Sequence, residues 1–198
     1  LELFLGSGLV TKLVLEKDRR FIGIDINPIS IEMANLFIDL PQVDEFLKAF
    51  TLIEKKVKEK IENTYKTNQD FVATHYLWED KKLIEVWHKK DRTSVSKKPT
   101  TYDLRLIDSF KNKKFTKYNL IPFYKNSRIG VSEKDNINSF FTKRALLNIK
   151  TLLNEIDKLE PQLKRCFQLV LSSNLGQMSN MVFAIKRRGS LKNKNLSK

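Results

Sequence analysis

The chain opens with two short apolar runs that flank an amphipathic segment. Residues 1–5 and 21–25 are dominated by Leu, Phe and Ile, and such short apolar runs predict buried strands. Residues 9–17 place Val and Leu side chains on one face at helical spacing, which predicts a helix between the strands. The sequence Gly-Ser-Gly at positions 6–8 joins the first strand to this helix.

A second helix is predicted to follow the second strand. Asn27 is a favoured N-cap residue and Pro28 a favoured first residue of a helix, which is expected to continue to about Asp39. Residues 1–40 thus predict the order strand, glycine turn, helix, strand, helix. This order begins a doubly wound sheet, so we expect an α/β fold with a partial Rossmann-like core.

A long helix and a β-rich insert are predicted next. Residues 41–64 repeat apolar side chains every three or four positions, opposite a face of lysine and glutamate. The insert is expected to span residues 65–125. Its predicted parts are a hairpin of strands 71–78 and 83–88, a polar loop over 89–101, and short strands over 104–110 and 118–124.

The C-terminal part is predicted to be helical over residues 138–189. Thr142 is a candidate N-cap for a helix that ends near Lys158, and Pro161 is expected to begin a second helix that continues to about Val182. Residues 190–198 are predicted to be a basic tail.

Positive charge is concentrated after the first forty residues. The 198-residue chain has a net charge of +14, although residues 1–40 contain only four basic residues against six acidic ones. A surplus of this size in the remaining chain indicates a polyanionic partner, most often nucleic acid. The alternative is a lysine-rich surface that serves only solvation. The last 13 residues hold six basic residues and no acid, and are a candidate phosphate contact.

The counts of cysteine and histidine argue against several classes of protein. Cys166 is the single cysteine, so an internal disulfide framework is excluded and a reducing compartment, the cytoplasm, is expected. His75 and His88 have no spacing typical of a metal site, and both are expected at surface positions of the hairpin. No apolar run reaches the roughly 18 residues of a membrane span, so no membrane contact is expected.

The glycine turn and an acid after the second strand together indicate a nucleotide site. Backbone N–H groups at such a turn approach a ligand closely when glycine provides no Cβ. Asp25 lies 19 residues after Gly6, where an acid accepts hydrogen bonds from ribose hydroxyls. A dinucleotide fingerprint has a third glycine where Thr11 stands, which makes a nicotinamide enzyme a distant alternative. Phe4 completes the form F-x-G-x-G, which is seen in S-adenosylmethionine enzymes.

The first 35 residues resemble a known family of enzymes. The segments "LELFLGSG" and "RRFIGIDINPISIEMA" are similar to the cofactor half of amino-methylating DNA methyltransferases, which modify adenine N6 or cytosine N4. The resemblance implies S-adenosylmethionine as cofactor and DNA as substrate and partner. It implies a cofactor site formed by Phe4, Gly6, Ser7, Gly8, Asp25 and Ile26.

The resemblance also implies a role for these residues. Gly6 and Gly8 match the glycines of the family's cofactor loop, Asp25 matches its ribose-binding acid, and Ile26 would pack against the adenine ring of the cofactor. The match has departures from the family pattern. Glu2 stands where aspartate is usual but keeps a carboxylate that could tie the loop down, and the usual Thr-Thr pair after the second glycine is replaced by Leu-Val.

A second segment is similar to the middle of a subgroup of these enzymes. In the subgroup a Phe-Thr-x-Arg-Asn-Leu-Leu segment begins a helix, and residues 141–147 read FTKRALL, with Ala145 in place of the asparagine. The subgroup often carries a small cysteine-rich zinc module before this segment. The predicted hairpin occupies that place without any cysteine, so the resemblance implies a module that folds without metal.

The catalytic loop of the family is absent from this sequence. The family uses a [D/N/S]-P-P-[Y/F/W] loop, which holds the target amino group and stacks an aromatic ring on the flipped base. The five prolines of the chain include no adjacent pair, so no catalytic residue is assigned. We therefore expect a truncated enzyme that lacks N- and C-terminal parts and transfers no methyl group by itself.

Two other interpretations of the sequence stay open. One is a catalytically dead remnant that binds nucleic acid without cofactor, and the other is an RNA-directed methyltransferase of the same architecture. The sequence does not indicate the target base, the recognition sequence or the oligomeric state.

Overall fold

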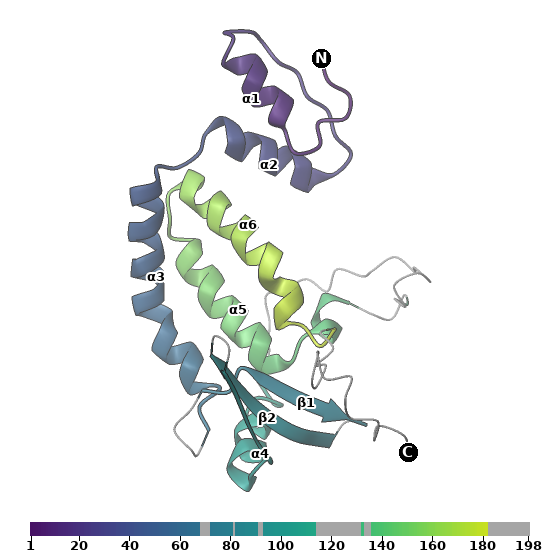
Figure 1. Ribbon diagram of the computed structural model, residues 1–198, viewed down its shortest axis with the longest axis vertical. Coiled ribbons are helices and arrows are strands. Elements are labelled where there is room, and N and C mark those ends of the chain that lie inside the picture. The colour runs from purple at the N-terminus through teal and green to yellow at the C-terminus, as the bar shows by residue number, and fades with distance from the viewer. Residues whose placement is uncertain (68–71, 81, 91–92, 114–131, 133–135, 182–198) are drawn as a thin grey trace. The chain divides into compact units, whose positions relative to one another are not determined.

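The structure, a computed structural model, describes residues 1–67, 72–80, 82–90, 93–113, 132 and 136–181. By its internal contacts the chain divides into two compact units. Unit 1 comprises residues 1–61 and 147–176, and unit 2 comprises residues 62–146 and 177–198. The chain passes between the units near the end of α3 (Val43–Asn63), near the start of α5 (Lys143–Ile156) and near the end of α6 (Pro161–Met178), as can be followed in Figure 1.

Two short helices lie in the first part of unit 1. α1 spans Leu9–Leu15 and α2 spans Pro28–Ile38, and the two helices contact each other. The Asn27 side chain accepts a hydrogen bond from the Ile29 N–H at 3.1 Å, which satisfies one of the free N–H groups of the first turn. The predicted N-cap and start of this helix are therefore confirmed.

The two predicted strands of this region form only a short parallel pairing. Glu2 bridges Gly23; its N–H donates to the Ile22 carbonyl at 2.9 Å, and its carbonyl accepts from the Ile24 N–H at 2.9 Å. The prediction of two five-residue strands is wrong in length. Parallel sheets are stable between covering layers, whereas Leu3 and Ile22 are more than half exposed here. Within the described residues a parallel pairing is present, but a doubly wound sheet is not.

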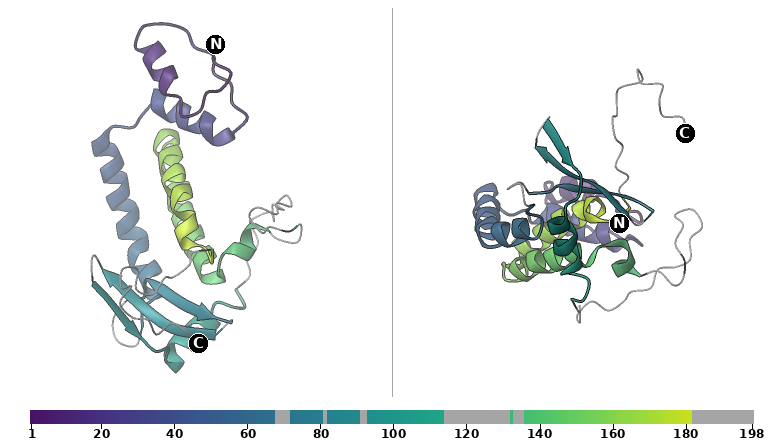
Figure 2. Two further views of the ribbon diagram at one scale, coloured as in Figure 1. Left: turned by 45° about the vertical axis from the view of Figure 1, so that its right-hand side comes forward. Right: turned by 90° about the horizontal axis from the view of Figure 1, so that it is seen from below.

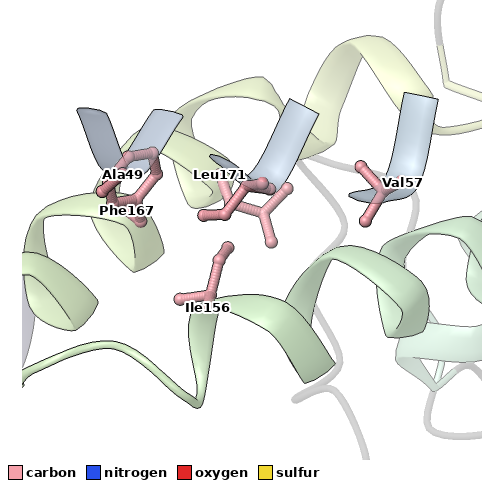
Figure 3. Packing of buried hydrophobic residues seen from close by; sticks show 6 residues of the cluster. Ala49, Val57, Ile156, Phe167 and Leu171 are labelled. Carbon is pink, nitrogen blue, oxygen red and sulfur yellow. The ribbon is translucent and has the colours of Figure 1, made fainter. Parts of the chain in front are cut away.

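The rest of unit 1 is a packing of α3, α5 and α6, which lie side by side in Figures 1 and 2. Phe46 of α3 stacks on Phe167 of α6 with ring centroids 4.6 Å apart. Burial of one apolar stripe stabilises α3, because isolated helices gain little from propensity alone. The buried side chains, shown in part in Figure 3, are Ala49, Ile53, Val57, Ile156, Phe167 and Leu171.

The predicted helices of this packing are confirmed, with earlier C-terminal ends. The long helix predicted over 41–64 is α3. The Ala145 N–H donates to Thr142 Oγ1 at 3.1 Å, so Thr142 caps α5 as predicted. α6 ends at Met178, because the Asn180 N–H donates to the Phe140 carbonyl at 2.7 Å and not to a carbonyl of the helix.

Unit 2 contains a three-stranded antiparallel sheet. β1 (His75–Glu79) pairs with β2 (Lys82–Lys90), which confirms the predicted hairpin, and β2 pairs with β3 (Thr93–Lys97). The polar loop predicted over 89–101 is therefore wrong for most of its length. The single apolar residue of β3, Val95, is 56% exposed, so this edge strand has no hydrophobic alternation that could predict it.

The strand predicted over 104–110 is also wrong, because α4 spans Thr101–Asp108. Thr100 and Asp103 form a capping box: Thr100 Oγ1 accepts from the Asp103 N–H at 3.4 Å, and Asp103 Oδ2 accepts from the Thr100 N–H at 2.8 Å. This reciprocal cap outweighs the strand-like alternation of apolar residues after it. The strand predicted over 118–124 and the tail over 190–198 lie outside the described residues.

A second, smaller core lies between the sheet and α4. Ala73, Leu83 and Val86 are buried there, and Tyr76 of β1 and Ile107 of α4 pack against them. A short helical turn of four residues, the 3-10 helix η2 (Ile137–Phe140), precedes α5. In the described part of unit 2, the sheet thus carries α4 on its buried face.

Candidate functional site

The chain turns sharply between the first strand segment and α1. Gly6 and Gly8 have φ angles of 55° and 76°, in the left-handed region that residues with a Cβ disfavour. The Gly8 N–H donates to the Leu5 carbonyl at 3.0 Å and closes the turn. A Cβ on Gly6 would meet only the Phe4 carbonyl oxygen, at 4.0 Å, so the space beside Gly6 is open.

Gly8 serves the packing of α2 against the turn. A Cβ at position 8 would lie 2.6 Å from Ala34 Cβ and 2.7 Å from Ala34 Cα, distances that no packed atoms tolerate. The sequence motif assigns both glycines to the approach of a ligand. The structure gives Gly8 a different reason, which is the close contact between the turn and the buried Ala34 of α2.

The Asp25 carboxylate holds the turn closed from the other side. Its Oδ1 accepts a hydrogen bond from the Asn27 N–H at 2.8 Å, and its Oδ2 accepts one from the Gly6 N–H at 2.8 Å. These bonds, from Asn27 first and Gly6 second, hold the pKa of Asp25 below its ordinary value, because they stabilise the charged form. The structure thus brings Gly6 and Asp25 together across 19 residues of sequence, with an anionic carboxylate facing the turn.

Exposed side chains lie close in sequence to Gly6 and to Asp25. Phe4 is 87% exposed and Ile26, next to Asp25, is fully exposed, while Ser7 at the tip of the turn is exposed as well. The carboxylate of Asp25 has about four acceptor sites, of which its two backbone hydrogen bonds and the Ser30 side chain use up to three. An anionic acceptor beside exposed apolar surface and open space fits an adenosine group, which has hydroxyl donors on its ribose and a flat ring.

Two buried polar groups near the turn have no hydrogen-bond partner among the described residues. They are Glu2 Oε2 and Thr11 Oγ1, and Thr11 is only 2% exposed. The tie that holds the turn therefore comes from Asp25. The resemblance seen in the sequence had instead implied that the Glu2 carboxylate could tie the loop down.

A separate polar cluster in unit 2 has no predicted role. Arg144, at the start of α5, is 6% exposed and lies against the rings of Tyr65 and Tyr76. Nearby in the same unit, Lys97 Nζ lies 2.7 Å from Asp103 Oδ2, and both side chains are buried. The sequence signal for the contacts of Arg144 is an arginine next to an apolar helix face. An analysis of hydrophobic periodicity predicts an ordinary surface residue at such a position.

The histidines and the cysteine identified in the sequence have structural surroundings. His88 Nδ1 lies 2.6 Å from the Val72 carbonyl oxygen, and the His75 ring lies 6.2 Å from the Trp87 ring across the hairpin. Burial raises the pKa of the half-buried Cys166 thiol, so its thiolate form is disfavoured.

An apolar pocket of about 620 Å³ lies elsewhere in unit 1, between α2 and α6. Its lining residues include Met33 and Phe37 from α2 and Val170 and Ser173 from α6. None of the six predicted cofactor residues lines it. In the part of the chain that the structure describes, no group of three or more acidic, histidine or cysteine residues could hold a metal ion, and no helix has both the length and the apolarity to span a bilayer.

One comparison with known proteins gives a match. The family model of the D12 class N6 adenine-specific DNA methyltransferase matches residues 1–175. No curated protein and no solved structure matches the chain significantly.

Proposed function

The chain belongs to the D12 class N6 adenine-specific DNA methyltransferase family, and from this premise we propose that it holds S-adenosylmethionine at the turn of residues 6–8. The observation that carries the proposal is the hydrogen bond between the Gly6 N–H and Asp25 Oδ2. It supports a preformed turn with an anionic acceptor at its edge. When bound, S-adenosylmethionine would supply the methyl group that the family transfers to adenine N6 in DNA.

Asp25 is proposed to bind the ribose of the cofactor. The carboxylate has a pKa below its ordinary value and stays ionised at neutral pH, so it remains an acceptor for hydroxyl donors. Its backbone partners, the N–H groups of Gly6 and Asn27, fix its orientation before any ligand binds. Phe4 and Ile26 are proposed to contact the adenine ring, because both are exposed apolar side chains, Phe4 two residues before Gly6 and Ile26 next to Asp25.

DNA is proposed to contact the chain after residue 40, where the positive charge is concentrated. The family acts on DNA, and a basic surface lowers the free energy of binding to phosphates by counterion release. We also propose that the chain is cytoplasmic, because its single cysteine fits a reducing compartment. We further propose that it transfers no methyl group by itself, because its five prolines include no Pro-Pro-aromatic loop. The same observation favours the second candidate function, a nucleic-acid-binding remnant without cofactor.

Photo-crosslinking of methyl-labelled S-adenosylmethionine separates the two candidates. After irradiation and trypsin digestion, we expect the label in the peptides of residues 1–12 and 21–48, which contain the turn and Asp25. Excess unlabelled S-adenosylhomocysteine should suppress the labelling. Label in other peptides would contradict the proposed site, and the absence of any label, alongside DNA binding, would favour the remnant.

A further inference from the structure

Arg144 occupies an unusual environment for a cation. Its guanidinium carbon lies 4.4 Å from the ring centroid of Tyr65 and 4.2 Å from that of Tyr76, so the group is held between two aromatic rings. Its Nη1 donates to the Tyr76 hydroxyl at 3.1 Å and to the Thr64 carbonyl at 3.3 Å. The residue is 6% exposed, and none of the ion pairs among the described residues involves it.

This environment depends on the planar shape of arginine. Desolvation of a cation without a carboxylate partner is costly, and contact with two ring faces offsets part of that cost. A planar guanidinium stacks on aromatic rings and donates from a fixed fork, whereas the compact ammonium of lysine does neither. The site therefore distinguishes arginine from lysine at constant charge.

The cluster connects three segments that are distant in sequence. Thr64 and Tyr65 directly follow α3, Tyr76 lies on β1, and Arg144 is the second residue of α5. The Tyr65 carbonyl also accepts from the Ala73 N–H at 2.9 Å, which ties the segment after α3 to the start of the β module. All these residues belong to unit 2.

Two of these segments lie next to two of the three covalent connections between the units. The chain leaves unit 1 after residue 61, three residues before Thr64, and returns to it at residue 147, three residues after Arg144. We propose that Arg144 is a positioning residue, whose stack between Tyr65 and Tyr76 restrains these two connections at once and so limits the movement of unit 2 relative to unit 1. The proposal does not depend on which ligand or polymer either unit binds.

Spin-label distance measurements on the full chain test this restraint. Nitroxides are placed at the exposed positions of Lys55→Cys in unit 1 and Glu79→Cys in unit 2, in a Cys166→Ser background. We expect a broader distance distribution in Arg144→Lys than in the parent chain, because the stack is lost while the charge is kept. Arg105→Lys, at an exposed position of unit 2, is the matched control and should leave the distribution unchanged.

A second label pair and a second variant separate restraint from general loss of structure. The pair Lys55→Cys with Arg165→Cys lies wholly within unit 1, and its distribution should stay the same in every variant. Tyr65→Leu removes one ring and should reproduce the broadening. An unchanged distribution in both variants would overturn the proposal, and so would loss of the β-sheet signal in both, since Arg144 would then be a folding residue of unit 2.

Discussion

At the scale of single residues, the two positions of the turn require glycine for different physical reasons. Gly6 has a left-handed backbone and open space beside it, whereas Gly8 has a left-handed backbone and a neighbour, Ala34, where its Cβ would be. The sequence predicted both glycines from a motif, and it predicted Asp25 from its spacing to Gly6. It could not predict the packing of Ala34 on Gly8, because that contact depends on where α2 lies.

The two glycines should therefore differ in their tolerance of alanine. Gly6→Ala should lower the free energy of unfolding by about 1–2 kcal/mol, the cost of a left-handed non-glycine residue. Gly8→Ala should lower the free energy of unfolding by the same backbone cost and by about 1–3 kcal/mol more, because the methyl group overlaps Ala34. Urea unfolding of both variants measures the difference.

The double variant Gly8→Ala with Ala34→Gly serves as the control. It should recover part of the overlap loss but not the backbone part, since Ala34→Gly removes the Cβ at 2.6 Å and leaves the backbone Cα at 2.7 Å. Equal destabilisation by the two single alanine variants would contradict the packing role of Gly8.

At the scale of elements, the sequence predicted the helices with a clear apolar stripe and a clear cap. α3 follows from the spacing of residues such as Ile53 and Val57, and α2 follows from Asn27-Pro28. α4 was missed because its apolar residues alternate as in a strand. Its signal was the pair Thr100 and Asp103, three residues apart, which is a capping box.

The buried pair of Lys97 and Asp103 should make unit 2 sensitive to acid. Burial alone would raise the pKa of Asp103, but hydrogen bonds from Lys97 and Thr100 outweigh it and hold the pKa below its ordinary value of 3.8. A carboxyl with a lowered folded-state pKa contributes stability above pH 3.8 that is lost as the pH falls through the folded pKa. Thermal unfolding between pH 7 and pH 3 should show this loss.

Asp103→Asn tests the same pair at neutral pH. It removes the negative charge that pairs with the buried Lys97 and should cost about 3 kcal/mol. Asp108→Asn is the matched control on the same helix, because its pair with Lys111 is exposed and should contribute less than about 1 kcal/mol. A similar loss in both variants would show that Asp103 acts only through helix capping or charge at the surface.

At the scale of the whole molecule, charge was predictable from the sequence and the division into units was not. The net charge of +14 and its concentration after residue 40 are properties of composition. The two units depend on long-range contacts, such as those of Arg144 with Tyr65 and Tyr76, which no periodicity encodes. The length of the parallel pairing at Glu2 and Gly23 also depends on long-range contacts, which is why the sequence predicted longer strands there.

The charge distribution predicts a strong salt dependence of DNA binding. The logarithm of the association constant should fall linearly with the logarithm of salt concentration, with a slope of about −0.9 for each phosphate neutralised. Removing residues 186–198, which contain six basic residues, should reduce the slope by up to about 5 if each contacts a phosphate. Fluorescence anisotropy with duplex DNA at several salt concentrations measures it, and a slope near zero would contradict a phosphate-binding surface.

The central claim is that the Asp25 carboxylate, held against the Gly6 turn, binds the ribose of S-adenosylmethionine. Calorimetric titration of the chain with this cofactor, beside Asp25→Ala and the exposed control Glu32→Ala, tests it most directly. We expect binding by the parent chain and by Glu32→Ala, and a loss of roughly 10- to 100-fold in Asp25→Ala, the value of hydrogen bonds to a charged acceptor. Equal affinity of Asp25→Ala and the parent chain, or no binding by either, would contradict the account.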